Sequence, residues 1–286
     1  MNKKRTKISK ISKMHFLKLL FRSSLFLLVF VLYIMNRGQN SEGFIPFISR
    51  YPLFTFIIWL VFVIEMLIRF FPSKVESLGC QKQFDTFFKQ RKKSAKPKIQ
   101  SRKRTFSVAV FWILLNSIIA ILYYNEIIDA GILILISLFY SVSDMICILF
   151  FCPFQTWFMK NKCCTSCRIY NWDFAMMFTP LIFIKSFYTW SLFAIAFILF
   201  LRWEVSIRRY PERFAENTNA ALSCGCCEEK LCHHKGQLRG FLEKNKNHLQ
   251  LKGNVVLNSS TQNIKEIKHS IQNKGQYNLH RKNEIK

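Results

Sequence analysis

The chain has none of the short motifs that mark common catalytic sites. It contains no phosphate-binding glycine loop, no Gly-x-Ser-x-Gly turn and no His-Glu-x-x-His helix motif, so the mechanisms that depend on them find no support. The repeated Cys-x-x-Cys-x-x-Cys runs of ferredoxin-type proteins are also missing,. No inverted repeat relates the two halves, which lowers the expectation of a secondary transporter. The sequence leaves open whether the protein is an enzyme.

Acidic side chains are scarce. The 286 residues include 16 Asp and Glu against 42 Lys and Arg, for a formal net charge of +26. These basic residues are spread over an N-terminal arm, a central loop and a long tail, without a groove-reading motif or an aromatic stacking platform. We therefore expect no nucleic acid partner. The excess of basic residues is better explained by the orientation of the chain in a lipid bilayer and by attraction to anionic lipid headgroups.

Apolar residues are concentrated in runs long enough to cross a bilayer. They make up 51% of the chain, and Phe alone occupies 30 positions. A soluble protein of this size needs a polar surface that such runs cannot provide. We expect an all-α, polytopic integral membrane protein with five or six membrane segments, located in the cell membrane.

Charge asymmetry between the loops predicts the orientation. A basic arm precedes the first apolar run, which has no small-residue cleavage site and is interpreted as a retained helix,. The loop after the second run is strongly basic, whereas the only charged residues at positions 125–130 are two acids. Both termini are therefore expected in the cytoplasm. The predicted parts are residues 1–18 (basic arm), 19–71 (first helix pair), 72–105 (basic loop), 106–151 (second helix pair), 152–173 (cysteine segment), 174–203 (kinked apolar hairpin), 204–252 (juxtamembrane and cysteine patch) and 253–286 (disordered tail).

The apolar region at residues 174–203 admits two interpretations. About 30 residues of helix span roughly 45 Å, which is too long for one untilted crossing and short for two. Pro180 and Lys185 interrupt it. A single kinked crossing would place the basic tail outside, so we favour a hairpin that returns the chain to the cytoplasm.

Cysteines form two patches that flank this hairpin. Cys164 and Cys167 form one Cys-x-x-Cys knuckle, and Cys224 and Cys227 form another. Four thiolates suit a tetrahedral zinc site or an iron–sulfur cluster, provided that both patches lie on one side of the membrane. Disulfide or thiol redox chemistry and unbonded cysteines are the alternatives. The auxiliary metal ligands are Cys152, Cys163, Cys226, Cys232 and His233.

Ionisable residues inside the apolar runs are the second lead. Glu65 and Asp144 each lie about two-thirds of the way along a run that descends to the cytoplasm, and Lys185 is a candidate partner for either. Charges in hydrocarbon are costly unless they pair, stay protonated or face a polar interior. The pair therefore marks either a proton or cation pathway or a contact that locks helices together.

Three functions follow from these features. The first is a membrane scaffold or docking module, built around a cysteine metal site on the cytoplasmic face and available to a protein partner. The second is an electron-transfer or thiol-redox protein that uses the same cysteines. The third is an ion or proton-coupled transporter that uses Glu65 and Asp144.

Overall fold

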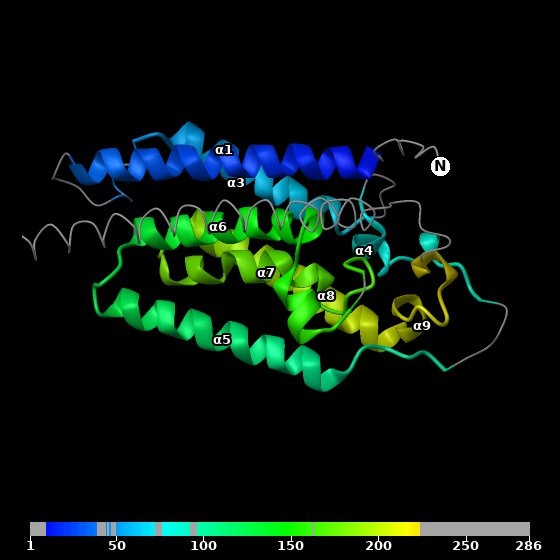
Figure 1. Ribbon diagram of the computed structural model, residues 1–286. Coiled ribbons are helices and arrows are strands. Elements are labelled where there is room, and N and C mark those ends of the chain that lie inside the picture. Colours follow the sequence, from blue (N-terminus) through cyan, green and yellow to red (C-terminus); the bar gives the residue numbers. More distant parts are fainter. Residues whose placement is uncertain are drawn as a thin grey trace, which may run out of the picture. The chain divides into compact units, whose positions relative to one another are not determined.

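A computed structural model describes residues 10–38, 44, 46, 50–71, 76–91, 96–161 and 163–223, all within the first of two compact units of the chain, Met1–His234. All the regular secondary structure in these residues is helical, and they contain no strand, which confirms the all-α prediction (Figure 1). Four helices are long and apolar enough to cross a membrane, namely α1 (Lys10–Gly38), α5 (Arg102–Tyr124), α6 (Ala130–Leu149) and α8 (Phe187–Arg209). A fifth apolar helix, α3 (Pro52–Ile68), is shorter.

Short helices lie between and after these five. They are α4 (Leu78–Gln81), η1 (Asp85–Phe87), η2 (Phe154–Phe158), η3 (Tyr170–Trp172), α7 (Asp173–Phe178), η4 (Thr179–Phe183), α9 (Pro211–Phe214) and η5 (Ala220–Leu222). Most of them follow α3, α6 or α8 at one end of the bundle. We call this end, which carries residues 152–168, the loop end. The opposite end, with residues 125–129 and 184–186, is the turn end.

Contacts along α1 show that it runs antiparallel to α6. Near its start Arg22 bonds to Asp144 late in α6. Near its end the Tyr33 hydroxyl donates to Asp129, which caps the first turn of α6 by accepting from the Ile132 amide. The residues of α1 that face the bundle recur every three or four positions, as expected for one face of a helix. They include His15, Arg22, Leu25, Val29 and Tyr33.

Several helix boundaries differ from the sequence-based expectation, among them the start of α5 at Arg102 and the end of α8 at Arg209, and polar contacts accompany two others. Helix α1 begins at Lys10, nine residues before the expected first run, because the polar residues Ser12 and His15 are buried against the bundle and extend its packed face. Helix α3 ends at Ile68 instead of Phe71, because Arg69, the residue that caps α3, turns its side chain toward Asp173. Polar contacts at the loop end, which hydropathy cannot reveal, set both limits.

The apolar region at residues 174–203 is divided at Ile184, where the backbone is extended. Helices α7 and η4 precede this break, and α8 follows it and packs against both. The Trp172 indole, at the start of α7, donates to Glu204 near the end of α8. The chain thus leaves the loop end at residue 173 and returns there by residue 204.

The buried apolar residues form one large cluster between α1, α3, α6, α7 and α8, and a second around Trp203 under the loop end. Many outward-facing residues are also apolar. Leu17, Leu27, Ile113 and Ile198 are among those that are more than half exposed. An apolar surface of this extent marks contact with lipid or another protein.

Gly131 permits the close approach of α1 and α6. A Cβ atom at this position would lie 2.6 Å from the Tyr33 ring and 3.0 Å from the Phe44 Cβ. We expect Gly131→Ala to lower the free energy of unfolding by about 1–3 kcal/mol, despite the better helix propensity of alanine, because the buried Tyr33 ring must move. Chemical unfolding in detergent measures this change. Adding Tyr33→Leu should recover part of the loss, and a single variant as stable as the parent would contradict the packing.

Candidate functional site

The cysteine segment at residues 152–168 folds into the one-turn helix η2 followed by a compact loop. Gln155 joins the two. Its backbone amide donates to Cys152 Sγ at 3.3 Å, and its side-chain amide donates to the Asn161 carbonyl oxygen at 2.9 Å. Its Oε1 accepts from Cys164 Sγ at 2.6 Å. Two thiols are therefore held on either side of one glutamine.

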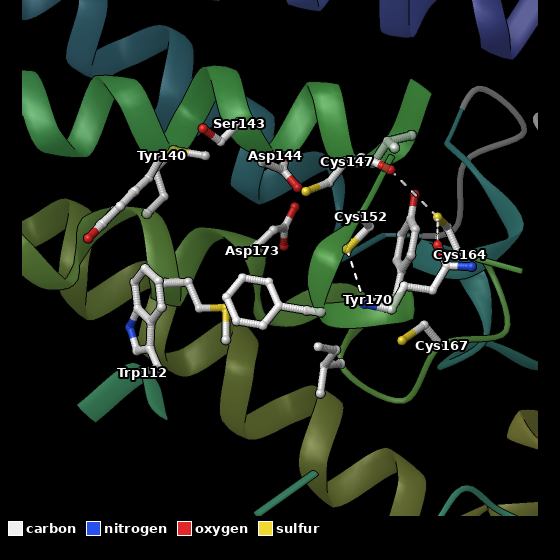
Figure 2. Close-up of a pocket in the computed structure, with 16 residues that line it drawn as sticks. Trp112, Tyr140, Ser143, Asp144, Cys147, Cys152, Cys164, Cys167, Tyr170 and Asp173 are labelled. Carbon is white, nitrogen blue, oxygen red and sulfur yellow. Dashed lines mark hydrogen bonds between the residues drawn. The ribbon is translucent and has the colours of Figure 1, made fainter. Parts of the chain in front are cut away.

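A cavity of about 130 Å³ lies between this segment and the bundle. We call it the thiol cavity. Figure 2 shows sulfur and carboxylate groups from four separate segments facing it. Aromatic and aliphatic side chains form the rest of its wall, including Trp112, Tyr140 and Met177. The sulfur and carboxylate side chains at the thiol cavity are Cys147, Cys152, Cys164, Cys167, Asp144 and Asp173.

Each aspartate of the thiol cavity is held by an arginine. Arg69 Nη1 lies 2.6 and 2.8 Å from the two carboxylate oxygens of Asp173, and both side chains are nearly inaccessible. Arg22 Nη1 lies 3.1 Å from Asp144 Oδ2. The arginines beside the two aspartates are thus already bound to carboxylates.

Arg22 is the centre of a larger network of buried charges. Its guanidinium is 1% exposed, and Nη2 lies 2.9 Å from Glu65 Oε2 on α3. Lys18 Nζ lies 2.8 Å from Glu65 Oε1 and 3.5 Å from Glu76. Two cations of α1 therefore hold three carboxylates from α3, α6 and the connection before α4. This geometry matches the helix-locking interpretation of Glu65 and Asp144.

The expectation that Lys185 pairs with these acids is wrong. Lys185 is exposed in the connection between η4 and α8 at the turn end, whereas Glu65 and Asp144 meet at Arg22. The roles of Arg22 and Asp173 were not expected from the sequence. A signal for Arg22 existed, since an arginine inside an apolar run requires buried partners.

The first cysteine knuckle does not present its two thiols to one point. Cys164 Sγ faces Gln155, whereas Cys167 is 5% exposed and packs in the aromatic cluster around Trp203. Burial raises the pKa of the Cys167 thiol to about 12, so it stays protonated at neutral pH. Cys163 turns away from the thiol cavity and bonds with the Thr165 hydroxyl at 3.1 Å.

Cys147, in the last turn of α6, lines the thiol cavity, as Cys152 does. It was not expected from the sequence to be a metal ligand. It follows Asp144 by three residues, so the two share one helix face. Figure 2 shows the Asp144 carboxylate and the Cys147 sulfur on the same side of the thiol cavity.

A charged and aromatic base holds the cysteine loop on α8. Arg168 forms two hydrogen bonds with the Glu204 carboxylate, at 2.6 and 2.7 Å. The Trp203 indole, which is fully buried, donates to the Arg168 carbonyl oxygen at 2.9 Å. This base fixes the position of Cys167, which immediately precedes Arg168.

The proposed partners of the first knuckle lie outside the described residues. These are Cys224, Cys226, Cys227, Cys232 and His233. Within the part of the chain that the structure describes, no group of three or more His, Cys, Asp or Glu side chains is already arranged as metal ligands. The metal site remains a prediction, and its described candidates now include Cys147 and the two aspartates.

Comparisons with known proteins found no matching family, no matching curated protein and no matching solved structure. The chemistry of the thiol cavity therefore carries the functional argument. Thiols and carboxylates in one cavity are suited to binding a cation that replaces the thiol protons.

Proposed function

We propose that the protein is a multi-pass membrane protein whose thiol cavity binds a zinc ion at the cytoplasmic face and thereby stabilises a docking surface. One observation carries this proposal, namely that four cysteines and two aspartates from separate segments face one cavity. Sulfur, nitrogen and carboxylate oxygen are the usual ligands of zinc. Because no ligand set is preformed, cation binding requires rotation of the cysteine side chains about χ1.

The surroundings favour a bound cation over a reactive thiol. Nucleophilic cysteines lie in electropositive sites that stabilise the thiolate. At the thiol cavity the groups that face the sulfurs are the carboxylates of Asp144 and Asp173, while Arg22 and Arg69 are bound to these acids. A zinc ion supplies the missing positive charge and makes thiolate formation favourable.

The distribution of exposed charge supports a cytoplasmic loop end. The exposed basic residues at this end include Lys98, Arg102, Lys103, Arg208 and Arg209. The turn end carries the acids Glu126 and Asp129 between α5 and α6 and fewer exposed basic residues, namely Arg37, Arg50 and Lys185. With the positive-inside bias, this distribution supports a cytoplasmic location for both termini, with the basic residues against anionic headgroups. Helices α1, α3, α5, α6 and α8 supply five membrane segments, with α7 and η4 as a short sixth.

The cysteine loop also presents an aromatic surface to which a protein partner can dock. The Trp157 side chain is 66% exposed and packs edge-to-face with the half-exposed Phe151 ring. Both flank Cys152 and Gln155, so zinc coordination would fix their orientation. Exposed aromatic residues on a rigid support are typical of the central contacts in protein interfaces.

Elemental analysis and zinc competition with a chromophoric chelator test the proposal. The protein, purified in metal-free detergent, should take up one zinc ion per chain through the thiol cavity. We expect Cys152→Ser and Cys164→Ser to weaken this binding at least about tenfold, equivalent to about 1.4 kcal/mol. Cys163→Ser is the matched control, since Cys163 bonds to Thr165 and does not line the cavity.

A second control separates the thiol cavity from the tail. Replacing Cys224, Cys226, Cys227 and Cys232 with serine leaves the cavity intact. Retained zinc binding in this variant supports the cavity site, and complete loss shows that the two knuckles share the ion. Protein that binds neither zinc nor iron under any of these conditions would overturn the proposal.

Thiol redox chemistry is the second candidate, because the side chains of Cys147 and Cys152 both line the thiol cavity. In this case both thiols would reduce a substrate disulfide, yielding a Cys147–Cys152 disulfide and two product thiols. Mass mapping after treatment with oxidised glutathione detects this bond. A visible absorbance that reductant bleaches would instead indicate an iron–sulfur cluster.

A further inference from the structure

A second cavity, of about 130 Å³, lies between α1, α3, α6 and α8. We call it the apolar cavity. Its inner wall consists of fully packed core residues, among them Val29, Phe62, Leu138 and Phe178. The volume is comparable to that of an engineered apolar cavity of about 150 Å³ that stays dry and binds benzene.

Three of the polar side chains that line the apolar cavity, those of Ser137, Thr189 and Trp59, already have hydrogen-bond partners. Ser137 Oγ donates to the Met177 carbonyl oxygen at 2.9 Å, and Thr189 Oγ1 donates to the Ile184 carbonyl oxygen at 2.8 Å. The Trp59 indole donates to Ser191 Oγ at 2.8 Å. A water molecule in a buried site needs two to four free polar partners, and these side chains offer few. The apolar cavity therefore favours a hydrocarbon occupant over water.

The accessible side of the apolar cavity lies at the turn end. Its partly exposed lining residues, Phe54, Trp59, Tyr188 and Thr189, belong to the first turns of α3 and α8. Deeper residues such as Val29 and Leu138 are closed off by the bundle. An aromatic and hydroxyl rim around a dry interior fits a molecule with a polar head and an apolar chain.

We propose that the apolar cavity binds the end of one hydrocarbon chain of a bilayer lipid, with the lipid head outside the Trp59 and Tyr188 rim. The inference rests on the proposed membrane location but is independent of zinc binding at the thiol cavity. Acyl and isoprenoid chains share the chemistry that the walls recognise, namely apolar surface with no hydrogen-bonding demand. The bound chain would fill empty space, which otherwise lowers the packing density between α1, α3 and α8.

Photocrosslinking in proteoliposomes tests the proposal. Two probes distinguish the lipid classes, a phospholipid with a diazirine near the end of one acyl chain and an isoprenoid phosphate with a terminal diazirine. We expect crosslinks at residues 54–62 and 188–192 in at least about fivefold excess over Ile113 and Ile118. These α5 residues are 63% and 56% exposed and report random contact with lipid.

Filling the apolar cavity should abolish this excess. Val29→Phe introduces a ring from α1, and Leu192→Phe introduces one from α8. If one of these variants fails to fold, the other still tests the proposal. Leu28→Phe is the control, because Leu28 precedes Val29 but is 47% exposed on the outer surface. Folding of each variant is confirmed by its unfolding temperature in detergent.

Three results would overturn the inference. The first is crosslinking in proportion to exposure, and the second is an excess that both filling variants retain. The third is labelling of the cavity residues by water-soluble probes and not by the lipid probes. Extraction of the whole protein from membranes by alkaline carbonate would instead refute the membrane location, so that failure is seen separately.

Discussion

Arg22→Ala is expected to lower the free energy of unfolding by about 3–5 kcal/mol, because it leaves two carboxylates inside the bundle without their cation. Glu65 and Asp144 lie 2.9 and 3.1 Å from the Arg22 guanidinium, which is 1% exposed. Arg22 Nη1 also donates to the Ser141 carbonyl oxygen at 3.1 Å. Removal of the side chain therefore breaks contacts from α1 to both α3 and α6. Thermal and chemical unfolding in detergent measure the loss.

Related variants show whether charge or packing causes the loss. Arg22→Lys keeps the positive charge but cannot contact both acids with a planar fork, so we expect a smaller defect. Combining Arg22→Leu with Glu65→Gln and Asp144→Asn removes all three charges and should recover most of the stability. An Arg22→Ala protein with an unchanged unfolding transition would show that the network does not hold the helices.

Trp203→Ala should have an effect of similar size, about 3–5 kcal/mol, because it removes a fully buried indole from the base of the cysteine loop. The indole packs edge-to-face on Phe214, with ring centroids 5.0 Å apart, and donates to the Arg168 carbonyl oxygen. Its loss leaves a cavity and an unpaired carbonyl beneath Cys167. We therefore expect the loop to open locally before the helices unfold.

Alkylation of Cys167 reports this opening separately from global unfolding. In the folded protein the thiol is 5% exposed and its pKa is raised to about 12, so only about one thiol in 10⁴ is ionised at pH 8. Peptide mapping after maleimide treatment should show faster labelling of Cys167 in Trp203→Ala. Trp203→Phe retains the aromatic packing and should label at an intermediate rate. Equal rates in all three proteins would exclude a role for Trp203 in closing the loop.

Local patterns predicted much of the architecture. Apolar runs and the basic residues around them identified the helical class and the four long helices, because hydropathy over about 20 residues depends only on nearby sequence. The break near Pro180 and Lys185 was also visible as an interruption of one run. The early start of α1 was not, since its first turns are polar and are held by buried contacts with distant segments.

The candidate site was predicted less completely. Cys152 and Cys164 were identified from their position in the cysteine segment, and both line the thiol cavity. Cys147 and Asp173 were not assigned to the site, because they lie in or beside apolar helices and their approach depends on how α6 and α7 pack. Lys185 was named as a candidate partner of the acids and Arg22 was not, since spacing along the chain says little about depth in a bundle.

The sequence by itself determined that this is a helical protein with apolar spans, an asymmetric distribution of basic residues and clustered cysteines. Only the tertiary structure decided which charges meet, which thiols share a cavity and where a dry cavity lies between the helices. The physical reason is the sequence separation over which the different interactions act. Hydropathy and helix formation act between residues close in sequence, whereas Arg22 meets Asp144 across 122 positions through the packing of whole helices.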